Sequence, residues 1–209
     1  MRPLLAIVTC GDPKFKARAD IQRAVWVPLV GDRADVRFFL SKQGRDPLPD
    51  EVFLDCPDDY RSLPLKVKLM FAWALANGYA KAMKLDDDTL VIPDRLLDGI
   101  PPQDYAGFLN GTPPKPWCSG FCYWLSEEAM RVVASAAIPE GEWAEDRWVG
   151  GVLHDHGIHP FYDRRYSLII PGWSMPNFKA AVAICDCTGD NCHPGGQPRT
   201  MKELQALCL

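Results

Sequence analysis

The chain has 209 residues, of which 47% are hydrophobic and 24% charged, and its formal net charge is −4. This balance is typical of a soluble globular protein with a buried core, and the negative charge excludes a broad basic face that would bind nucleic-acid phosphates. No apolar run is long enough to span a membrane. The first residues lack the cleavage site of a secretion signal, so we expect a cytoplasmic protein.

The first part of the chain alternates between strand and helix patterns, which predicts a parallel α/β sheet. The expected elements are a strand at 4–10, a helix at 16–26, and strands at 35–41 and 51–56. Within the helix, Ala17, Ile21, Ala24 and Val25 recur at helical spacing and are expected to face the core.

The clearest helix begins after Ser62, which can cap it, and it stops at Asn77 and Gly78. Its apolar stripe is predicted to consist of Leu65, Leu69, Ala72, Trp73 and Ala76. A strand at 82–85 follows and runs directly into three aspartates, at positions 86–88. Because open α/β sheets bind ligands at the carboxyl ends of their strands, these aspartates are the first candidates for a functional site.

The remaining chain is predicted to contain four further strands and three helices. The strands are expected at 105–109, 121–126, 167–170 and 181–187. Helices are expected at 127–136, with Ser126 as the cap, and at 145–157. A short amphipathic helix near the C-terminus is predicted from the spacing of Met201, Leu204 and Leu207.

Three adjacent carboxylates repel one another unless a cation lies among them. Because alternate residues of a strand share a face, Asp86 and Asp88 are expected to point one way and Asp87 the other. Two carboxylates on one face suit a hard divalent ion such as Mg²⁺ or Mn²⁺, which proteins commonly bind together with substrate phosphates. The alternative is an acidic turn that stays solvated and holds no metal.

A second cluster of metal-binding residue types lies near the C-terminus, at Cys185, Cys187, Cys192 and His193. The spacing C-x-C-x4-C-H could hold zinc, but it lacks the paired C-x2-C units that are typical of a structural zinc site. A zinc-stabilised module is therefore an alternative interpretation of this part of the chain.

Five segments, in order along the chain, resemble motifs of the β-1,3-galactosyltransferase and Fringe-like glycosyltransferases. They are RADIQRAVW (18–26), DDYRSLPLK (58–66), KLDDDTLV (84–91), WCSGFCYWLS (117–126) and AEDRWVGGVL (144–153). With HPGGQPRTM (193–201), the resemblance spans nearly the whole chain. It implies an α/β fold with a mixed, mostly parallel central sheet, in a single GT-A domain. Residues 1–98 would form the nucleotide-sugar-binding half and residues 99–209 the acceptor half.

The resemblance also implies residue roles. Asp88 would ligate Mn²⁺ or Mg²⁺, with Asp86 and His193 as further ligands. Asp146 would be the general base, in the first turn of a helix, where a negative charge is favourable. The residues expected to bind the nucleotide sugar are Thr9, Arg18, Arg23, Lys66, Asp86 and Asp87, and those expected to contact the acceptor are Trp117, Gly120, Tyr123 and Glu145. Because Arg18 and Arg23 are five residues apart, at most one of them is expected to touch phosphate.

The function implied is metal-dependent, inverting transfer of a sugar from a UDP-sugar to a hydroxyl of a carbohydrate or glycoconjugate. Animal members of the family are membrane-anchored, whereas this chain shows no anchor, so a cytoplasmic enzyme of bacterial or viral type is expected. A retaining or other nucleotide-sugar enzyme would keep the metal site without needing Asp146. A non-enzymatic carbohydrate-binding module, stabilised by zinc, is the remaining alternative.

Overall fold

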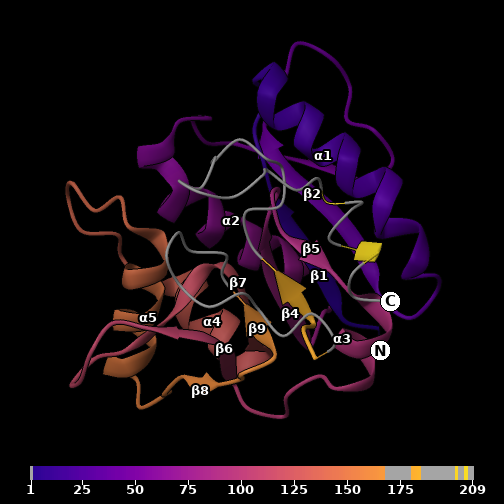
Figure 1. Ribbon diagram of the computed structural model, residues 1–209. Coiled ribbons are helices and arrows are strands. Elements are labelled where there is room, and N and C mark those ends of the chain that lie inside the picture. Colours follow the sequence, from indigo (N-terminus) through magenta and orange to yellow (C-terminus); the bar gives the residue numbers. More distant parts are fainter. Residues whose placement is uncertain (1, 168–179, 185–200, 202–204, 207–209) are drawn as a thin grey trace, which may run out of the picture.

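The computed structural model describes the chain except for residues 1, 168–179, 185–200, 202–204 and 207–209 (Figure 1). Its centre is a seven-stranded mixed sheet with the strand order β3-β2-β1-β4-β7-β6-β8. The strands are β1 Leu4–Val8, β2 Asp35–Ser41, β3 Glu51–Leu54, β4 Lys81–Asp86, β6 Tyr105–Asn110, β7 Trp117–Ser126 and β8 Phe161–Tyr162. The first four run parallel, while β7 is antiparallel to both β4 and β6.

A second, small sheet lies just beyond the three aspartates. It has the order β5-β10-β9, formed by Leu90–Val91, Ala183–Ile184 and Tyr166–Ser167. The backbone N–H of Ile92 donates to the carbonyl of Val182 at 2.9 Å and extends this pairing. The chain that follows the aspartates is thereby tied to a segment about ninety residues further on.

Helices cover both faces of the large sheet (Figure 1). They are α1 Pro13–Val25, η1 Val27–Leu29, η2 Tyr60–Ser62, α2 Leu63–Ala76, α3 Pro93–Asp98, α4 Glu127–Ser135 and α5 Glu145–Asp155. Because side chains alternate along a strand, Leu5 and Ile7 of β1 pack into a cluster with α1 and α3. Leu4 and Ala6 pack into a separate cluster with α2, α4 and α5.

Most of the predicted elements are confirmed, but some of their ends, caps and short elements differ; β7 begins at Trp117 instead of residue 121, and α1 begins at Pro13 instead of residue 16. Ser126 caps α4, since its hydroxyl accepts from the N–H of Ala129 at 3.3 Å. Ser62 is the N-cap residue of α2, as predicted, but its hydroxyl makes no capping bond; the Asp59 carboxylate accepts from the N–H of Ser62 at 2.9 Å and caps the preceding η2. The elements β5, α3 and β8 were not predicted, because each is too short to show a period. The predicted strands at 167–170 and 181–187 and the final helix lie only partly within the described residues.

The buried sides of α1 and α2 differ from the predicted ones. In α1 the buried residues are Arg18, Ala19 and Gln22, whereas Ile21 is 38% exposed. The polar side of this helix faces the sheet because the aspartates that follow β4 bind it, as described below. The helix α2 is apolar nearly all round, so its sequence did not define which side is buried; the fully buried side chains include Val67, Met70, Phe71 and Ala74, not the predicted stripe.

Among the described residues, no helix combines the length and the apolar character that crossing a bilayer requires.

The buried side of α2 can be tested by comparing two truncations on this helix. Met70→Ala removes a fully buried side chain, and we expect the free energy of unfolding to fall by about 2–5 kcal/mol. Leu65→Ala, on the predicted stripe but only partly buried, should cost less than about 1 kcal/mol. Urea denaturation followed by circular dichroism measures both, and equal losses would contradict the assignment of the buried side.

Candidate active site

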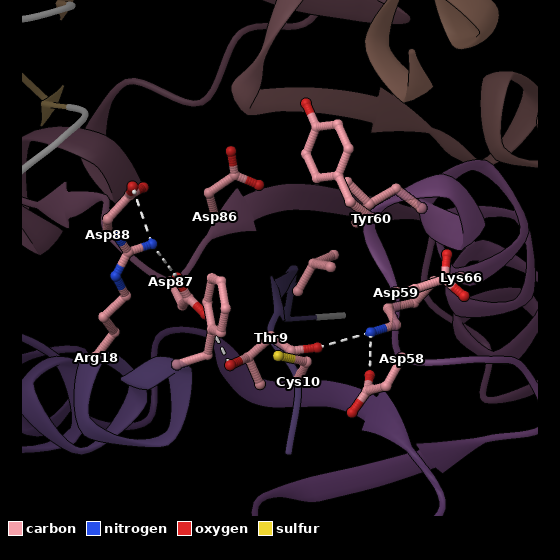
Figure 2. Close-up of a pocket in the computed structure, with 13 residues that line it drawn as sticks. Thr9, Cys10, Arg18, Asp58, Asp59, Tyr60, Lys66, Asp86, Asp87 and Asp88 are labelled. Carbon is pink, nitrogen blue, oxygen red and sulfur yellow. Dashed lines mark hydrogen bonds and ion pairs between the residues drawn. The ribbon is translucent and has the colours of Figure 1, made fainter. Parts of the chain in front are cut away.

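A cleft of about 330 Å³ opens at the carboxyl ends of β1 and β4 (Figure 2). The two strands are hydrogen-bonded neighbours with Val8 opposite Asp86, so the residues after each strand end lie side by side. The hydroxyl of Thr9 accordingly donates to the carboxylate of Asp87, with Oγ1 2.8 Å from Oδ2. The register of this strand pair therefore brings the first loop of the protein to the three aspartates, which we call the aspartate turn.

Asp87 lies at the bottom of the cleft, only 4% exposed. The guanidinium group of Arg18 lies 3.3 Å from its Oδ1 and 3.4 Å from Oδ2 of Asp88, so Arg18 bridges two of the three carboxylates. Burial raises the pKa of Asp87 to about 6, and the charge of Asp86 adds to this, while the bonds from Thr9 and Arg18 act in the opposite direction.

The backbone of the aspartate turn is held by Gln22, which is fully buried in α1. Its side-chain amide donates to the carbonyl of Asp86 at 3.0 Å and to that of Thr89 at 2.9 Å. In Figure 2 the carboxylates of Asp86 and Asp88 point to one side of the turn and Asp87 points toward Thr9 on the other. This is the arrangement that strand alternation predicts, although β4 ends at Asp86.

A buried ammonium group links the aspartate turn to the second half of the sheet. Lys84 is 2% exposed, and its Nζ lies 2.5 Å from Oδ1 of Asp86 and 3.3 Å from Oε2 of Glu145, and it donates to the carbonyl of Gly120. Burial lowers the pKa of Lys84, but the charges of Asp86 and Glu145 outweigh it and hold this pKa above its ordinary value. The lysine therefore stays charged and joins β4, β7 and α5.

Glu145 and Tyr123 support this link and do not face the cleft. The phenol of Tyr123 is fully buried and donates to Oε1 of Glu145, which is 5% exposed. Burial raises the pKa of Glu145 to about 7, and the charge of Lys84 and the bond from Tyr123 act in the opposite direction. The expectation that these two residues contact an acceptor is corrected, because neither side chain offers an accessible surface.

Asp146 stands at the start of α5, beside β7. Its Oδ2 accepts from the backbone N–H of Gly120 at 3.0 Å and from the indole N–H of Trp117 at 3.3 Å. A Cβ at Gly150 would lie 2.3 Å from Cβ of Trp117, so α5 approaches β7 this closely only because residue 150 is glycine. Trp117 and Gly120, predicted to contact the acceptor, thus hold the carboxylate of Asp146 in place.

The predicted cationic residues separate into two groups. Lys66 lines the cleft, but its ammonium donates to the carbonyl of Thr9 at 2.8 Å and to Asp58 at 2.5 Å. Arg23 instead forms ion pairs with Asp50 and Glu51 at the start of β3 and does not line the cleft. Of the two arginines of α1, Arg18 contacts the aspartate turn, while Arg23 contacts other carboxylates; that at most one of them touches phosphate stays a prediction.

The charge balance of the cleft bears on whether it can hold a metal. The described residues that line it include five carboxylates, of Asp58, Asp59, Asp86, Asp87 and Asp88, against two cationic groups, of Arg18 and Lys66. An anionic diphosphate would be repelled here unless a further cation came with it. Over the described ranges no set of three or more His, Cys, Asp and Glu side chains converges to hold a metal. His193 and the three late cysteines lie outside the described residues.

No protein-family model and no curated protein matches this sequence, but solved structures do. A protein from Desulfovibrio desulfuricans G20, described as a putative nucleotide-diphospho-sugar transferase, is 12% identical, with a TM-score of 0.54 over 100% of this chain and 97% of that one. A glycosyltransferase involved in glycosylation of the major capsid of PBCV-1 is 11% identical, with a TM-score of 0.53 over 98% of both chains.

The catalytic domain of Drosophila β1,4-galactosyltransferase 7, solved in complex with xylobiose, is 15% identical with a TM-score of 0.50. The match covers 78% of this chain but only 65% of that domain, so this chain spans about two thirds of it. At these identities the likeness shows the fold alone. The chain has the GT-A type of α/β fold, with a mixed and mostly parallel central sheet in a single domain, as predicted.

The raised pKa of Glu145 makes a prediction about stability and pH. A carboxyl that holds its proton more tightly in the folded state stabilises the fold below its ordinary pKa of 4.5 and loses this contribution as pH rises through about 7. We therefore expect the wild type to lose stability relative to Glu145→Gln across this pH range. Denaturant titrations at pH 4.5 and pH 8 measure the difference, and Glu140→Gln, at an exposed position, is the matched control. A difference that does not change with pH would contradict the raised pKa.

Proposed function

We propose that this protein is a metal-dependent glycosyltransferase that moves a sugar from a UDP-sugar to a hydroxyl of a carbohydrate, with inversion at the anomeric carbon. One observation carries the proposal: a cleft at the carboxyl ends of β1 and β4 is lined by the aspartate turn and Arg18, on a GT-A type fold. The ordered motifs that resemble β-1,3-galactosyltransferases and Fringe-like enzymes support the same function.

The donor would lie in the cleft with its diphosphate beside the aspartate turn. The guanidinium of Arg18, 3.3 Å from Asp87, would form a charge-assisted hydrogen bond to a phosphate oxygen. Lys66 contributes its charge from the wall of the cleft while its ammonium holds the Thr9 loop. The volume of the cleft is at the low end for a small-molecule site, which suits the nucleotide part of the donor.

The donor set fits a hard divalent cation. Asp88 and Asp86 point to one side of the turn (Figure 2), and sites for Mg²⁺ and Mn²⁺ commonly use one or two carboxylates, with substrate phosphates and water completing the shell. Because carboxylates outnumber cationic groups in the cleft, a diphosphate is expected to bind there together with such an ion and not without it. In this proposal His193 is a third ligand. The cation, when bound, would stabilise the negative charge that the departing UDP acquires.

Asp146 would act as the base. Its carboxylate removes the proton from the acceptor hydroxyl as the hydroxyl oxygen bonds to the anomeric carbon, and the bond from that carbon to the diphosphate oxygen breaks on the opposite side. The electron pair of the broken bond leaves with UDP, and the configuration at the anomeric carbon is inverted. The N–H groups of Gly120 and Trp117 fix Oδ2 of Asp146, so the base is oriented before the acceptor arrives.

The donor site is tested by titrating UDP into the protein by calorimetry, with Mn²⁺ and then with EDTA. We expect binding that requires Mn²⁺ and weakens by at least about tenfold in Asp88→Ala, because the mutation removes a carboxylate that would hold the ion. Asp98→Ala, at an exposed position on α3, is the control and should bind as the wild type does. UDP binding that is unchanged by EDTA would contradict the proposed metal dependence. An absence of UDP binding would contradict the proposed UDP-sugar donor.

The base is tested by Asp146→Asn, which keeps the shape of the side chain but cannot accept a proton. We expect the transfer rate to fall by about 10²–10⁴-fold, while UDP binding stays within about twofold of the wild type. Asp155→Asn, at the exposed end of the same helix, is the control. Transfer is followed by NMR of the product, which also reports the anomeric configuration; an unchanged rate, or a retained configuration, would show that Asp146 is not the base of an inverting reaction.

A further inference from the structure

Two large aromatic side chains lie exposed beside the cleft. Tyr60, in η2, is 68% exposed, and Trp143, in the loop before α5, is 49% exposed. Their ring centroids are 5.8 Å apart and their planes are inclined by 40°. Apolar rings grouped in water are unfavourable and commonly mark a binding surface. We call these two side chains the aromatic pair.

The aromatic pair connects the cleft with the helix that carries Asp146. Tyr60 lines the cleft, and its ring rises from the rim toward the same side as the carboxylate of Asp86 (Figure 2). Tyr60 also lines a second, open hollow of about 620 Å³, together with Arg61, Gly141, Glu142 and Trp143. Because Trp143 precedes Asp146 by three residues, a molecule that lies on the pair is close to the start of α5.

The loop that carries Trp143 is already fixed in position. Oε1 of Glu142 accepts from the N–H of Trp143 at 3.0 Å and from that of Ala144 at 2.9 Å. The guanidinium of Arg147 lies 3.0 Å from the same oxygen, and Gly141 supplies a positive φ of 77° at the turn. Since the backbone of this loop does not have to be ordered on binding, the conformational cost of placing a ligand against the Trp143 ring is reduced.

The chemistry of the second hollow fits a sugar ring. Sugar rings present an apolar C–H face, which packs on aromatic rings, and hydroxyls, which need hydrogen-bond partners at the edge. The rings of Tyr60 and Trp143 supply the apolar surface, while the exposed guanidinium of Arg61 and the carboxylate of Glu142 supply a donor and an acceptor. Both polar groups line the same hollow as the rings.

We infer that the aromatic pair and the second hollow form the acceptor subsite, which takes a pyranose ring of a carbohydrate and directs one of its hydroxyls toward Asp146. The inference rests on the proposed function, because that function assigns the base. It replaces Tyr123 and Glu145, which are buried, with exposed residues that a sugar can reach.

Trp143→Ala is the decisive variant, because Trp143 does not line the cleft and the mutation changes none of the residues that do. The probes are methyl β-galactoside, methyl α-glucoside, cellobiose and xylobiose, each tested at millimolar concentration by saturation-transfer NMR in the presence of UDP and Mn²⁺. We expect at least one probe to bind the wild type and to bind Trp143→Ala about tenfold more weakly, while Trp143→Phe keeps most of the affinity.

Phe161→Ala is the matched control, since Phe161 is 44% exposed on the edge strand β8 and should leave probe binding unchanged. Equal probe binding by the wild type and Trp143→Ala, or no binding of any probe by a wild type that binds UDP, overturns the subsite. Calorimetric titration of UDP on the same samples separates the two proposals. Saccharide binding that depends on Trp143 without any UDP binding would support the subsite and remove the donor site.

Discussion

Much of the candidate site depends on one buried positive charge, the ammonium group of Lys84. It contacts Asp86 at the end of β4, Glu145 on α5 and the carbonyl of Gly120 on β7, and burying such a group is costly unless it is fully paired. Without it, the buried carboxylate of Glu145 would lose the cationic group that it shares with Asp86. Lys84 therefore helps to fix the aspartate turn relative to the helix that bears Asp146, together with the close packing of α5 on β7 at Gly150.

A second polar set fixes the aspartate turn from the other side of the sheet. Arg18 and Gln22 occupy the buried side of α1, where a helix of a globular protein usually places apolar residues. Arg18 pairs with two carboxylates, and Gln22 holds two carbonyls of the turn. The residues of this helix that contact the aspartate turn are thus also its buried residues, and the packing of the helix on the sheet depends on these polar contacts.

This double use explains where prediction from the sequence succeeded and where it failed. The strand at 35–41 was predicted with its observed bounds, because its apolar and β-branched residues have no competing role. The apolar positions of α1 predicted the wrong buried side. Polar residues of this helix are buried because they contact the aspartate turn, which lies far along the chain. The position of the aspartates at a strand end was predictable, but their partner Lys84 was not, because a lysine within a strand gives no sign that its ammonium is buried. Tyr123 and Trp143 illustrate the same limit, as an aromatic side chain can be either core or surface.

The pairing of β1 with β4 also bears on how the site forms during folding. The hydrogen bond between Thr9 and Asp87 joins residues 78 positions apart, and every bond from α1 to the aspartate turn spans a comparable length of chain. The entropy of closing so long a loop must be lost before any of these contacts forms. A growing chain that has not yet reached β4 therefore has no cleft, although the first residue that lines the cleft is Val8.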